Sequence, residues 1–228
     1  MKLFLDSASQ EEMAEYGHLV QGFTTNPTLA RRAGVQDYAA WGRETAALVA
    51  DKPISFEVVT DDHQEMVRQA LLIHEWGPNV FVKIPITNTE GKSSASVIRR
   101  LSKAGIKVNV TAITTVRQVK DAIKALDKSA KAIISVFAGR IADTGVNPRG
   151  TMRFAVKHTR AFRGFDVLWA SPRQVLDIDM AEACGVDIIT VSKDILAKRQ
   201  LKGRDLTEYS LETVKQFYTD STLSGYTL

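Results

Sequence analysis

Apolar residues along this chain gather in eight short runs that are rich in Val, Ile, Phe and Leu. Between the runs, apolar residues recur every three or four positions, which is the spacing of an amphipathic helix. The pattern therefore predicts eight strands that alternate with helices. The predicted strands are residues 2–7, 22–26, 54–59, 80–86, 107–113, 132–137, 165–171 and 187–192.

This alternation favours one fold class. Nearly continuous apolar strands are typical of a parallel sheet covered by helices, and eight such units favour a closed (β/α)8 TIM barrel over an open sheet. No linker or low-complexity segment interrupts the spacing, so we predict a single domain over residues 1–228. An additional C-terminal helix is expected at about residues 206–220. Its apolar face, with Leu211, Val214 and Phe217, would pack on the barrel or on a neighbouring subunit.

Four predicted strands each carry one polar residue between apolar ones. In a closed barrel every second side chain points into the lumen, and a polar residue is placed more easily there than against the helices. We expect all four to lie toward the C-terminal halves of their strands, where barrel enzymes build their active sites. The four residues are Asp6, Glu57, Lys83 and Asn109.

The lysine has two interpretations. Lys83 and Glu57 would lie on adjacent strands and could satisfy each other as a structural ion pair. Alternatively, a buried lysine can attack a ketone and form a Schiff base, a reaction that needs carboxyl groups nearby to move protons. Burial lowers the pKa of a lysine and nearby carboxylates raise it, and the sequence does not show which effect is larger.

Composition narrows the function classes. The net charge is only +4, and basic residues are interleaved with acidic ones, which argues against nucleic-acid binding and suits small anionic substrates. No apolar run reaches the length of a membrane span, and the first ten residues do not resemble a signal peptide. The single cysteine, Cys184, fits a reducing compartment, so we predict a cytoplasmic protein. The four histidines show no metal-ligand spacing.

A phosphate site is predicted near the end of the seventh strand. Ser171 has the character of a helix N-cap, Pro172 suits the first helical position, and Arg173 follows in the first turn. A helix N-terminus with an arginine attracts anions. Arg140, just beyond the sixth strand, is expected on the same face of the barrel. Each arginine alone could equally form a surface salt bridge.

Eight segments, in order along almost the whole chain, resemble the short-subunit transaldolases and the related fructose-6-phosphate aldolases. They are FLDSA, GFTTNPTL, SFEV, VKIPIT, EG, VNVTAI, SVFAGRIAD and ASPRQ. The resemblance implies a (β/α)8 barrel that transfers a dihydroxyacetone unit from a ketose phosphate to an aldose phosphate. It also implies that no metal or organic cofactor takes part.

The resemblance assigns roles residue by residue. Lys83 would be the Schiff-base lysine, Asp6 the base that triggers cleavage, and Glu57, with Thr111, the group that activates a catalytic water. The hydroxyls of the three-carbon unit would be bound by Asn26, Asn109 and Ser135, and the phosphate by Arg140, Ser171 and Arg173.

Two positions separate the two activities within the family. Glu57 and Phe137 match transaldolases, whereas the aldolases tend to have glutamine and tyrosine there. The alternatives are an aldolase that releases dihydroxyacetone, a sugar-phosphate-binding barrel without catalysis, and a basic protein that binds nucleic acid. The physiological role stays open between the pentose phosphate pathway and the synthesis of unusual sugars.

The chain departs from its relatives in two regions. Pro172 stands where many relatives have an apolar, non-proline residue, and it could re-aim Arg173. The C-terminal tail lacks a His-Pro segment and a terminal tryptophan that are common in relatives. Relatives form decamers of two five-subunit rings, so a homo-oligomer is expected here.

Overall fold

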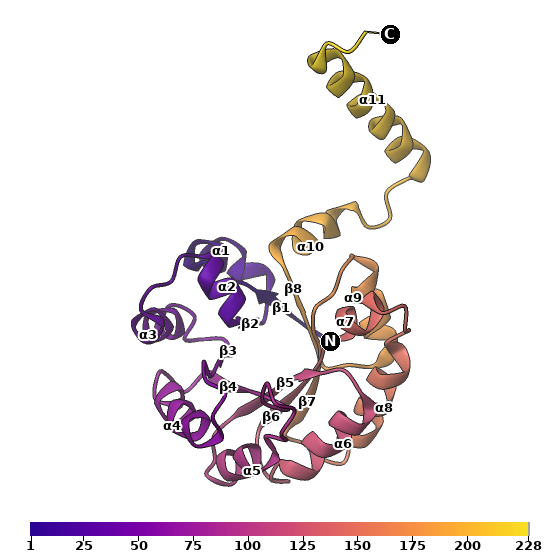
Figure 1. The fold of residues 1–228 in the computed structure, drawn as a ribbon. Coiled ribbons are helices and arrows are strands. Elements are labelled where there is room, and N and C mark those ends of the chain that lie inside the picture. Colours follow the sequence, from indigo (N-terminus) through magenta and orange to yellow (C-terminus); the bar gives the residue numbers. More distant parts are fainter. Residues whose placement is uncertain (228) are drawn as a thin grey trace.

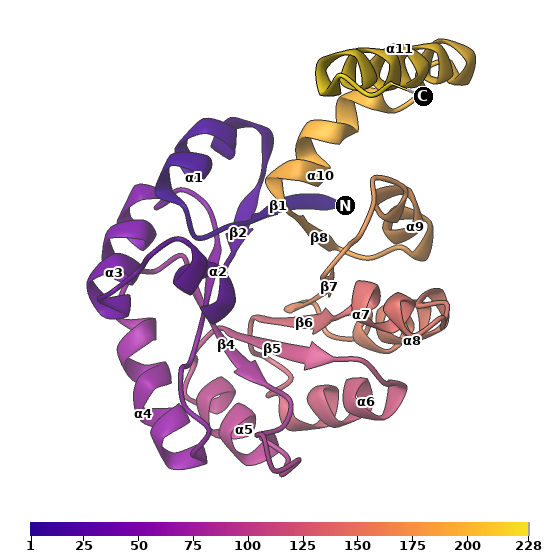
Figure 2. The ribbon, with the colours of Figure 1, turned by 45° about the horizontal axis from the view of Figure 1, so that its top comes forward.

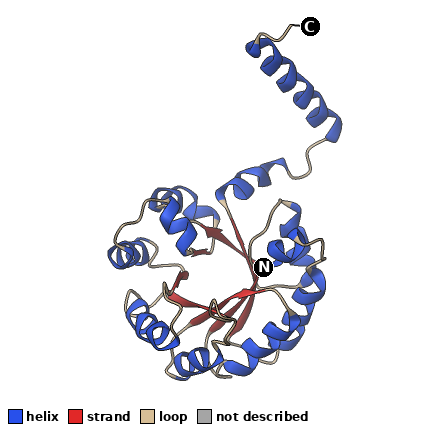
Figure 3. Ribbon diagram, in the orientation of Figure 1, coloured by secondary structure: helices blue, strands red, loops and turns tan. Residues whose placement is uncertain are grey.

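A computed structural model describes residues 1–227, so residue 228, the last of the predicted domain, lies outside the described part. Eight parallel strands close into a barrel in sequence order, with the last strand paired to the first. Figures 1 and 3 show helices around the outside of these strands. The predicted barrel is confirmed, and each predicted run contains one strand. The strands are β1 Lys2–Asp6, β2 Gly22–Thr24, β3 Ile54–Glu57, β4 Val80–Pro85, β5 Val108–Ile113, β6 Ala132–Val136, β7 Phe165–Trp169 and β8 Ile188–Val191.

Helices follow every strand, and those between the strands bury their apolar faces against the outside of the barrel. Within residues 1–227, no helix combines the length and apolar character needed to span a bilayer. The α-helices are α1 Gln10–Tyr16, α2 Pro27–Arg32, α3 Tyr38–Leu48, α4 His63–His74, α5 Ala95–Lys103, α6 Val116–Ala125, α7 Ala138–Asp143, α8 Arg149–Thr159, α9 Leu176–Cys184, α10 Lys193–Lys198 and α11 Leu206–Ser224; the 3-10 helices are η1 Gly17–Leu19 and η2 Arg199–Leu201.

An apolar layer fills the lumen toward the N-terminal ends of the strands. Its members come from five different strands and pack into one cluster, separate from the larger core under the helices. Such a layer makes the barrel a packed core rather than a pore. The layer consists of Phe4, Ile133, Leu168 and Ile188, with the half-buried Phe81 packed against them.

A polar layer lies above the apolar one. Side chains alternate along a strand, so the residue two positions beyond an apolar lumen residue also points into the lumen, closer to the carboxyl end. Polar residues occupy that position in four of the five strands that supply the apolar layer. They are Asp6 in β1, Lys83 in β4, Ser135 in β6 and Thr190 in β8.

The C-terminal helix differs from the prediction in length and in packing. It continues to Ser224 and ends at Gly225, which has a positive φ of 65°. Figures 1 and 2 show α11 standing away from the barrel, and none of its residues is buried. It therefore does not pack on its own barrel, and packing on a neighbouring subunit stays a prediction. The large apolar and aromatic residues that α11 exposes are Leu206, Tyr209, Leu211, Val214, Phe217, Tyr218 and Leu223.

Candidate active site

The lumen brings Lys83 and Glu57 into contact. Lys83 is buried, and its Nζ lies 2.9 Å from Glu57 Oε2. The same Nζ donates a hydrogen bond of 2.7 Å to the carbonyl oxygen of Thr25. The ion pair considered in the sequence interpretation is present. Removing two charges from water carries a desolvation cost that attraction within the pair must offset.

Asn109 stands beside Lys83 on the next strand. The barrel register aligns Glu57 with Lys83 and Lys83 with Asn109. Asn109 is only the second residue of β5, so the expectation that all four polar residues lie in C-terminal halves is wrong for this one. Because neighbouring strands of a barrel are staggered, an early residue of β5 still lies level with Lys83.

Asp6 occupies the end of β1 and accepts a short hydrogen bond from a threonine. Thr24 Oγ1 donates to Asp6 Oδ1 at 2.7 Å and lies 2.6 Å from Thr190 Oγ1. Because the single Thr24 proton goes to Asp6, Thr190 is the donor in the second bond. The two threonines thus form a chain that ends on the carboxylate.

The pKa of the Asp6 carboxyl is raised above its ordinary value, mainly because burial disfavours the charged form. The Lys83 ammonium and the Thr24 hydroxyl oppose this by lowering the pKa, whereas Glu57 raises it. A carboxylate with a raised pKa is a stronger base than one in water, which suits a group that must remove a proton.

A second chain of hydrogen bonds crosses the lumen through Asn109. The Asn109 Nδ2 donates to Ser55 Oγ at 3.0 Å, and Ser135 Oγ donates to Asn109 Oδ1 at 2.7 Å. All three side chains are buried. This chain fixes which way the amide faces, so Asn109 and Ser135 present defined donors and acceptors to the lumen.

Thr111 carries an uncommitted hydroxyl at the end of the regular ladder between β5 and β6. Its Oγ1 is buried and has no hydrogen-bond partner among residues 1–227. The next residue, Ala112, has a φ of 61°, and the register shifts between Val110 and Ile113. This bulge interrupts the ladder beside Thr111, at the carboxyl end of the strand.

Asn26 and Phe137 lie at strand-to-helix junctions. Asn26 caps α2, because its Oδ1 accepts a hydrogen bond of 3.0 Å from the Leu29 amide. Its amide donors are not used by this cap. Phe137 is half-buried at the start of α7 and packs against the apolar lumen cluster.

The predicted helix start at Ser171 is wrong. Helix α9 begins at Leu176, and Ser171 adopts a φ of 60°, which a helix N-cap does not have. The Asp177 carboxylate instead accepts hydrogen bonds from the backbone amides of Arg173 and Gln174, at 2.6 and 3.2 Å. These bonds hold residues 171–175 as a loop ahead of the helix.

Arg173 and Arg140 both lie at the carboxyl ends of the strands, as expected. Arg173 forms a two-pronged ion pair with Asp143 of α7, in which its Nε donates to Oδ1 at 3.0 Å. Arg140 is one turn earlier on the same helix and is exposed. The salt-bridge alternative is therefore observed for Arg173, and an anion would share that guanidinium with Asp143.

Gly139 permits the backbone at Ser171 to lie close to α7. A Cβ atom built on Gly139 would lie 1.5 Å from the carbonyl oxygen of Ser171. No side chain fits in that space, so only glycine permits this approach. The contact brings Ser171 and Arg140 onto neighbouring segments.

Three hydroxyl side chains of the site were missed from the sequence. They are Thr24, Ser55 and Thr190, and each bonds to a predicted site residue or to its partner. A signal was present, because each lies at a position whose alternation along the strand points into the lumen. In apolar strands, however, a single serine or threonine is common and carries little weight.

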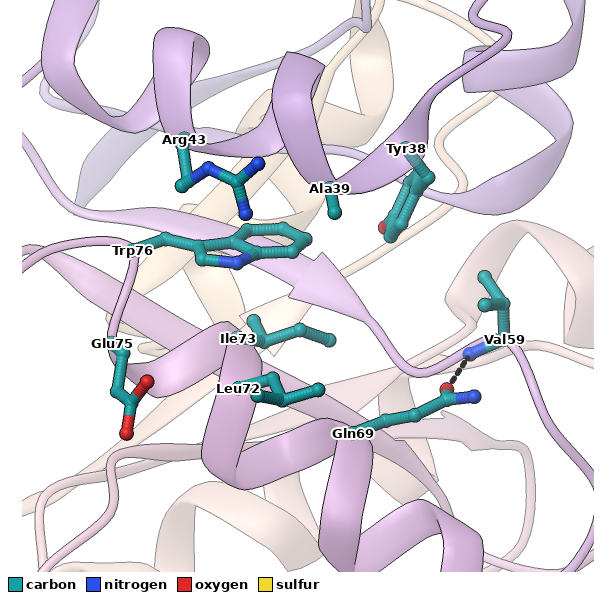
Figure 4. Close-up of a pocket in the computed structure, with 9 residues that line it drawn as sticks. All are labelled: Tyr38, Ala39, Arg43, Val59, Gln69, Leu72, Ile73, Glu75 and Trp76. Atoms are coloured by element: carbon teal, nitrogen blue, oxygen red, sulfur yellow. Dashed lines mark hydrogen bonds between the residues drawn. The ribbon is translucent and has the colours of Figure 1, made fainter.

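A groove of about 370 Å³ lies outside the barrel between α3 and α4. Figure 4 shows Tyr38, Trp76 and Ile73 among the residues that line it. None of the predicted catalytic or binding residues lines this groove. The lumen, with its lysine and two carboxyl groups, is therefore the candidate active site. Among residues 1–227, no three His, Cys, Asp or Glu side chains form a group suited to a metal ion.

Comparison with known proteins gives one consistent result. A family model described as transaldolase/fructose-6-phosphate aldolase matches residues 3–225. A probable transaldolase of Streptococcus agalactiae is 38% identical over 217 residues, which cover 93% of this chain and 95% of the relative. A probable transaldolase of Dehalococcoides mccartyi is 36% identical over 200 residues, covering 86% and 88%.

Solved structures that resemble the chain support the fold. A 3-hexulose-6-phosphate synthase from Salmonella typhimurium superposes with a TM-score of 0.59 at 15% identity, covering 86% of this chain and 91% of the other. KGPDC from Streptococcus mutans superposes with a TM-score of 0.58 at 13% identity, covering 84% and 88%. At such low identity these matches bear on the barrel alone.

We expect Asp6→Asn to stabilise the protein near neutral pH. The folded state holds the Asp6 proton more tightly than the unfolded chain does. The free energy of unfolding therefore falls as the pH rises from 3.8, the ordinary pKa of an aspartate, through the raised pKa of the folded state. Asparagine carries no charge, so it removes the free-energy cost of ionising Asp6 in the folded state. Urea unfolding should therefore show a higher free energy of unfolding for the variant at pH 7, with a difference that shrinks toward pH 4.

Asp51→Asn is the matched control, because Asp51 is exposed and the change in charge is the same. It should leave the free energy of unfolding nearly unchanged at both pH values. A loss of stability in Asp6→Asn at pH 7 would contradict the inferred cost of the buried carboxylate.

Proposed function

The chain belongs to the transaldolase/fructose-6-phosphate aldolase family, and we propose that it is a transaldolase that works through a Schiff base on Lys83. Its substrates would be a ketose phosphate donor, such as fructose 6-phosphate or sedoheptulose 7-phosphate, and an aldose phosphate acceptor. The observation that carries the proposal is a buried lysine amine 2.9 Å from a carboxylate, in a lumen that also holds Asp6.

In the first step, the Lys83 amine attacks the C2 carbonyl carbon of the donor, and a water molecule leaves to give an imine. An ammonium cannot attack, so Lys83 must first lose a proton, and Glu57 is the acceptor in direct contact. Glu57 later activates the water that hydrolyses the imine. We assign Thr111 to help hold that water, because its buried hydroxyl has no hydrogen-bond partner among residues 1–227.

Asp6 then cleaves the carbon chain. It accepts the proton of the C4 hydroxyl as the bond between C3 and C4 breaks, and the electron pair of that bond moves into the protonated imine to form a neutral enamine. The aldehyde fragment leaves. When an acceptor binds, the enamine carbon attacks its carbonyl carbon, and Asp6 returns the proton to the new hydroxyl.

The remaining polar groups would bind the substrate. We assign the hydroxyls of the three-carbon unit to Asn26, Asn109 and Ser135, of which the last two are joined by a hydrogen bond of 2.7 Å. The phosphate would lie against Arg140, Ser171 and Arg173, where α7 meets the loop before α9. Pro172 lies within this loop and is proposed to influence which sugar phosphate fits.

Transfer, rather than release, is favoured by two residues. Phe137 presents a ring without a hydroxyl beside the lumen, so it offers the enamine no proton. Glu57 retains the carboxylate that the aldolases of the family tend to lack. The alternative is fructose-6-phosphate aldolase activity, which releases free dihydroxyacetone. A barrel without catalysis is disfavoured by the joint presence of Asp6, Glu57 and Lys83.

The cellular setting follows from this chemistry as part of the proposal. A transaldolase would act in the cytoplasm on sugar phosphates of the pentose phosphate pathway. Synthesis of unusual sugars by the same chemistry is the competing role. We propose no binding partner of the nucleic-acid or membrane type, since the charges of both signs are mixed along the chain.

We also propose that the protein is a homo-oligomer held in part by α11. This helix of 19 residues exposes Phe217 at 66% and Leu223 at 81% of their surface, and it does not touch its own barrel. Exposed apolar faces of this length are typical of an interface. Sedimentation of the intact protein, compared with Val214→Asp/Phe217→Asp, should show a smaller assembly for the variant; a monomeric intact protein would contradict the proposal.

The function is tested by supplying fructose 6-phosphate with and without erythrose 4-phosphate. Sedoheptulose 7-phosphate should form at least roughly tenfold faster than dihydroxyacetone appears without acceptor, because the enamine waits for an aldehyde. Mass spectrometry distinguishes the two products. Lys83→Met should abolish both, whereas Lys107→Met, which removes a lysine from the N-terminal end of the barrel, should retain activity. Equal rates of release and transfer would establish the aldolase alternative instead.

Arg173 is expected to matter for phosphorylated sugars alone. Because arginine and phosphate form charge-assisted and often two-pronged hydrogen bonds, Arg173→Ala should lower kcat/KM for fructose 6-phosphate by at least roughly tenfold. The rate with free fructose should change much less. Asp143→Asn removes the carboxylate that shares Arg173, so its KM for fructose 6-phosphate should fall or stay constant. Equal losses for both sugars in Arg173→Ala would mean that the arginine supports the fold.

A further inference from the structure

The ladder between β2 and β3 stops just before Glu57. Thr25 donates its backbone N–H to the Ser55 carbonyl at 3.1 Å, and this is the last backbone bond between the two segments. In a parallel ladder, the next bonds would join the Glu57 N–H to the Thr25 carbonyl and the N–H of residue 27 to the Glu57 carbonyl. Residue 27 is a proline, which has no N–H.

The other expected bond, from the Glu57 N–H to the Thr25 carbonyl, is also absent. The Thr25 carbonyl accepts its hydrogen bond from the Lys83 ammonium, at 2.7 Å. The Glu57 N–H is not directed to this oxygen but to a side chain. The backbone of Glu57 therefore needs another donor and another acceptor at the end of β3.

One hydroxyl group supplies both. Tyr38 Oη donates to the Glu57 carbonyl at 3.1 Å and accepts from the Glu57 N–H at 3.2 Å. Tyr38 is the first residue of α3, and the Asp37 side chain caps that helix by accepting from the amides of Ala39 and Ala40. The helix start thus fixes where the hydroxyl stands.

The Tyr38 ring is held by aromatic neighbours. Its centroid lies 5.4 Å from that of Trp41 and 5.8 Å from that of Trp76. Burial raises the pKa of the Tyr38 hydroxyl, so it keeps the proton that it donates to Glu57. Figure 4 shows the Tyr38 ring among the residues that line the outer groove.

A side chain of the next helix, α4, also bonds to the backbone just after Glu57. Gln69 of α4 accepts a hydrogen bond of 2.8 Å from the Val59 amide, drawn in Figure 4. Side chains from two flanking helices therefore replace the missing strand ladder on this segment. The segment carries the Glu57 carboxylate to within 2.9 Å of Lys83.

We propose that Tyr38 is a positioning residue for the Lys83 reaction. Its hydroxyl bonds to both the N–H and the carbonyl of Glu57, which the ladder with β2 does not pair, and so holds the Glu57 carboxylate beside the amine. The inference rests on the proposed function, because it takes Glu57 as the group that exchanges protons with Lys83 and with water. A tyrosine outside the barrel thereby sets the geometry of a reaction inside it.

Tyr38→Phe tests this directly, because it keeps the ring and removes only the oxygen. We expect kcat for transfer from fructose 6-phosphate to erythrose 4-phosphate to fall roughly tenfold, as for loss of about one well-placed hydrogen bond. KM for the sugars should stay within about twofold, since the substrate does not contact Tyr38. Trp41→Phe, which disturbs the same aromatic cluster but no bond to Glu57, should lower the melting temperature with little change in kcat.

A double-mutant cycle separates positioning from general support of the fold. In a Glu57→Gln background the carboxylate is already lost, so adding Tyr38→Phe should lower the remaining kcat by less than about twofold. An equal loss in both backgrounds, or an unchanged kcat in Tyr38→Phe alone, would overturn the proposal. Wild-type protein without transfer activity would remove the proposed function itself, and this inference with it.

Asp37→Ala serves as a second variant if Tyr38→Phe does not fold. It removes the cap that fixes the start of α3 but leaves the hydroxyl in the chain. The same pattern is expected in weaker form, with a loss of kcat that disappears in the Glu57→Gln background. A loss that is equal in the two backgrounds would again contradict positioning.

Discussion

The buried ion pair between Lys83 and Glu57 is the interaction on which the rest of the site depends. An ammonium in the lumen of a barrel is tolerated only with a partner and further hydrogen bonds, and Glu57 and the Thr25 carbonyl supply them. The ladder between β2 and β3 stops at this point, and the Glu57 N–H does not bond to the Thr25 carbonyl. Tyr38 then replaces the missing bonds on Glu57. The buried charge and the end of the strand pairing therefore meet at Glu57.

The barrel supports this site through its two lumen layers. An apolar layer closes the N-terminal side of the lumen, and polar side chains stand at the next inward positions above it. Water is excluded from below, so charges and hydrogen bonds at the polar layer act more strongly than they would in solvent. The raised pKa of Asp6 is one result, and it combines a stronger base with a cost in stability. A site that includes such a cost is expected to serve chemistry rather than folding.

The strands and the central residues were predictable because they depend on simple periodicity. Apolar runs located all eight strands, and the neighbouring order of β3 and β4 was enough to pair Glu57 with Lys83. The loop at Ser171 was not predictable, because its shape depends on amides held by Asp177 and on a close approach at Gly139. Tyr38 left no sequence signal, since its hydroxyl bonds to backbone atoms 19 positions away along the chain. The partner of α11 stays a prediction, because no residue of this helix is buried within the chain.

The most direct test of the account is to trap the covalent intermediate on the intact protein. Borohydride added with fructose 6-phosphate should reduce the imine to a stable amine and leave one sugar-derived adduct per chain. Peptide mass spectrometry should place that adduct on Lys83 alone, and no adduct should form without the sugar. An adduct on another lysine, or none in a protein that transfers dihydroxyacetone units, would contradict a reaction centred on the Lys83 amine.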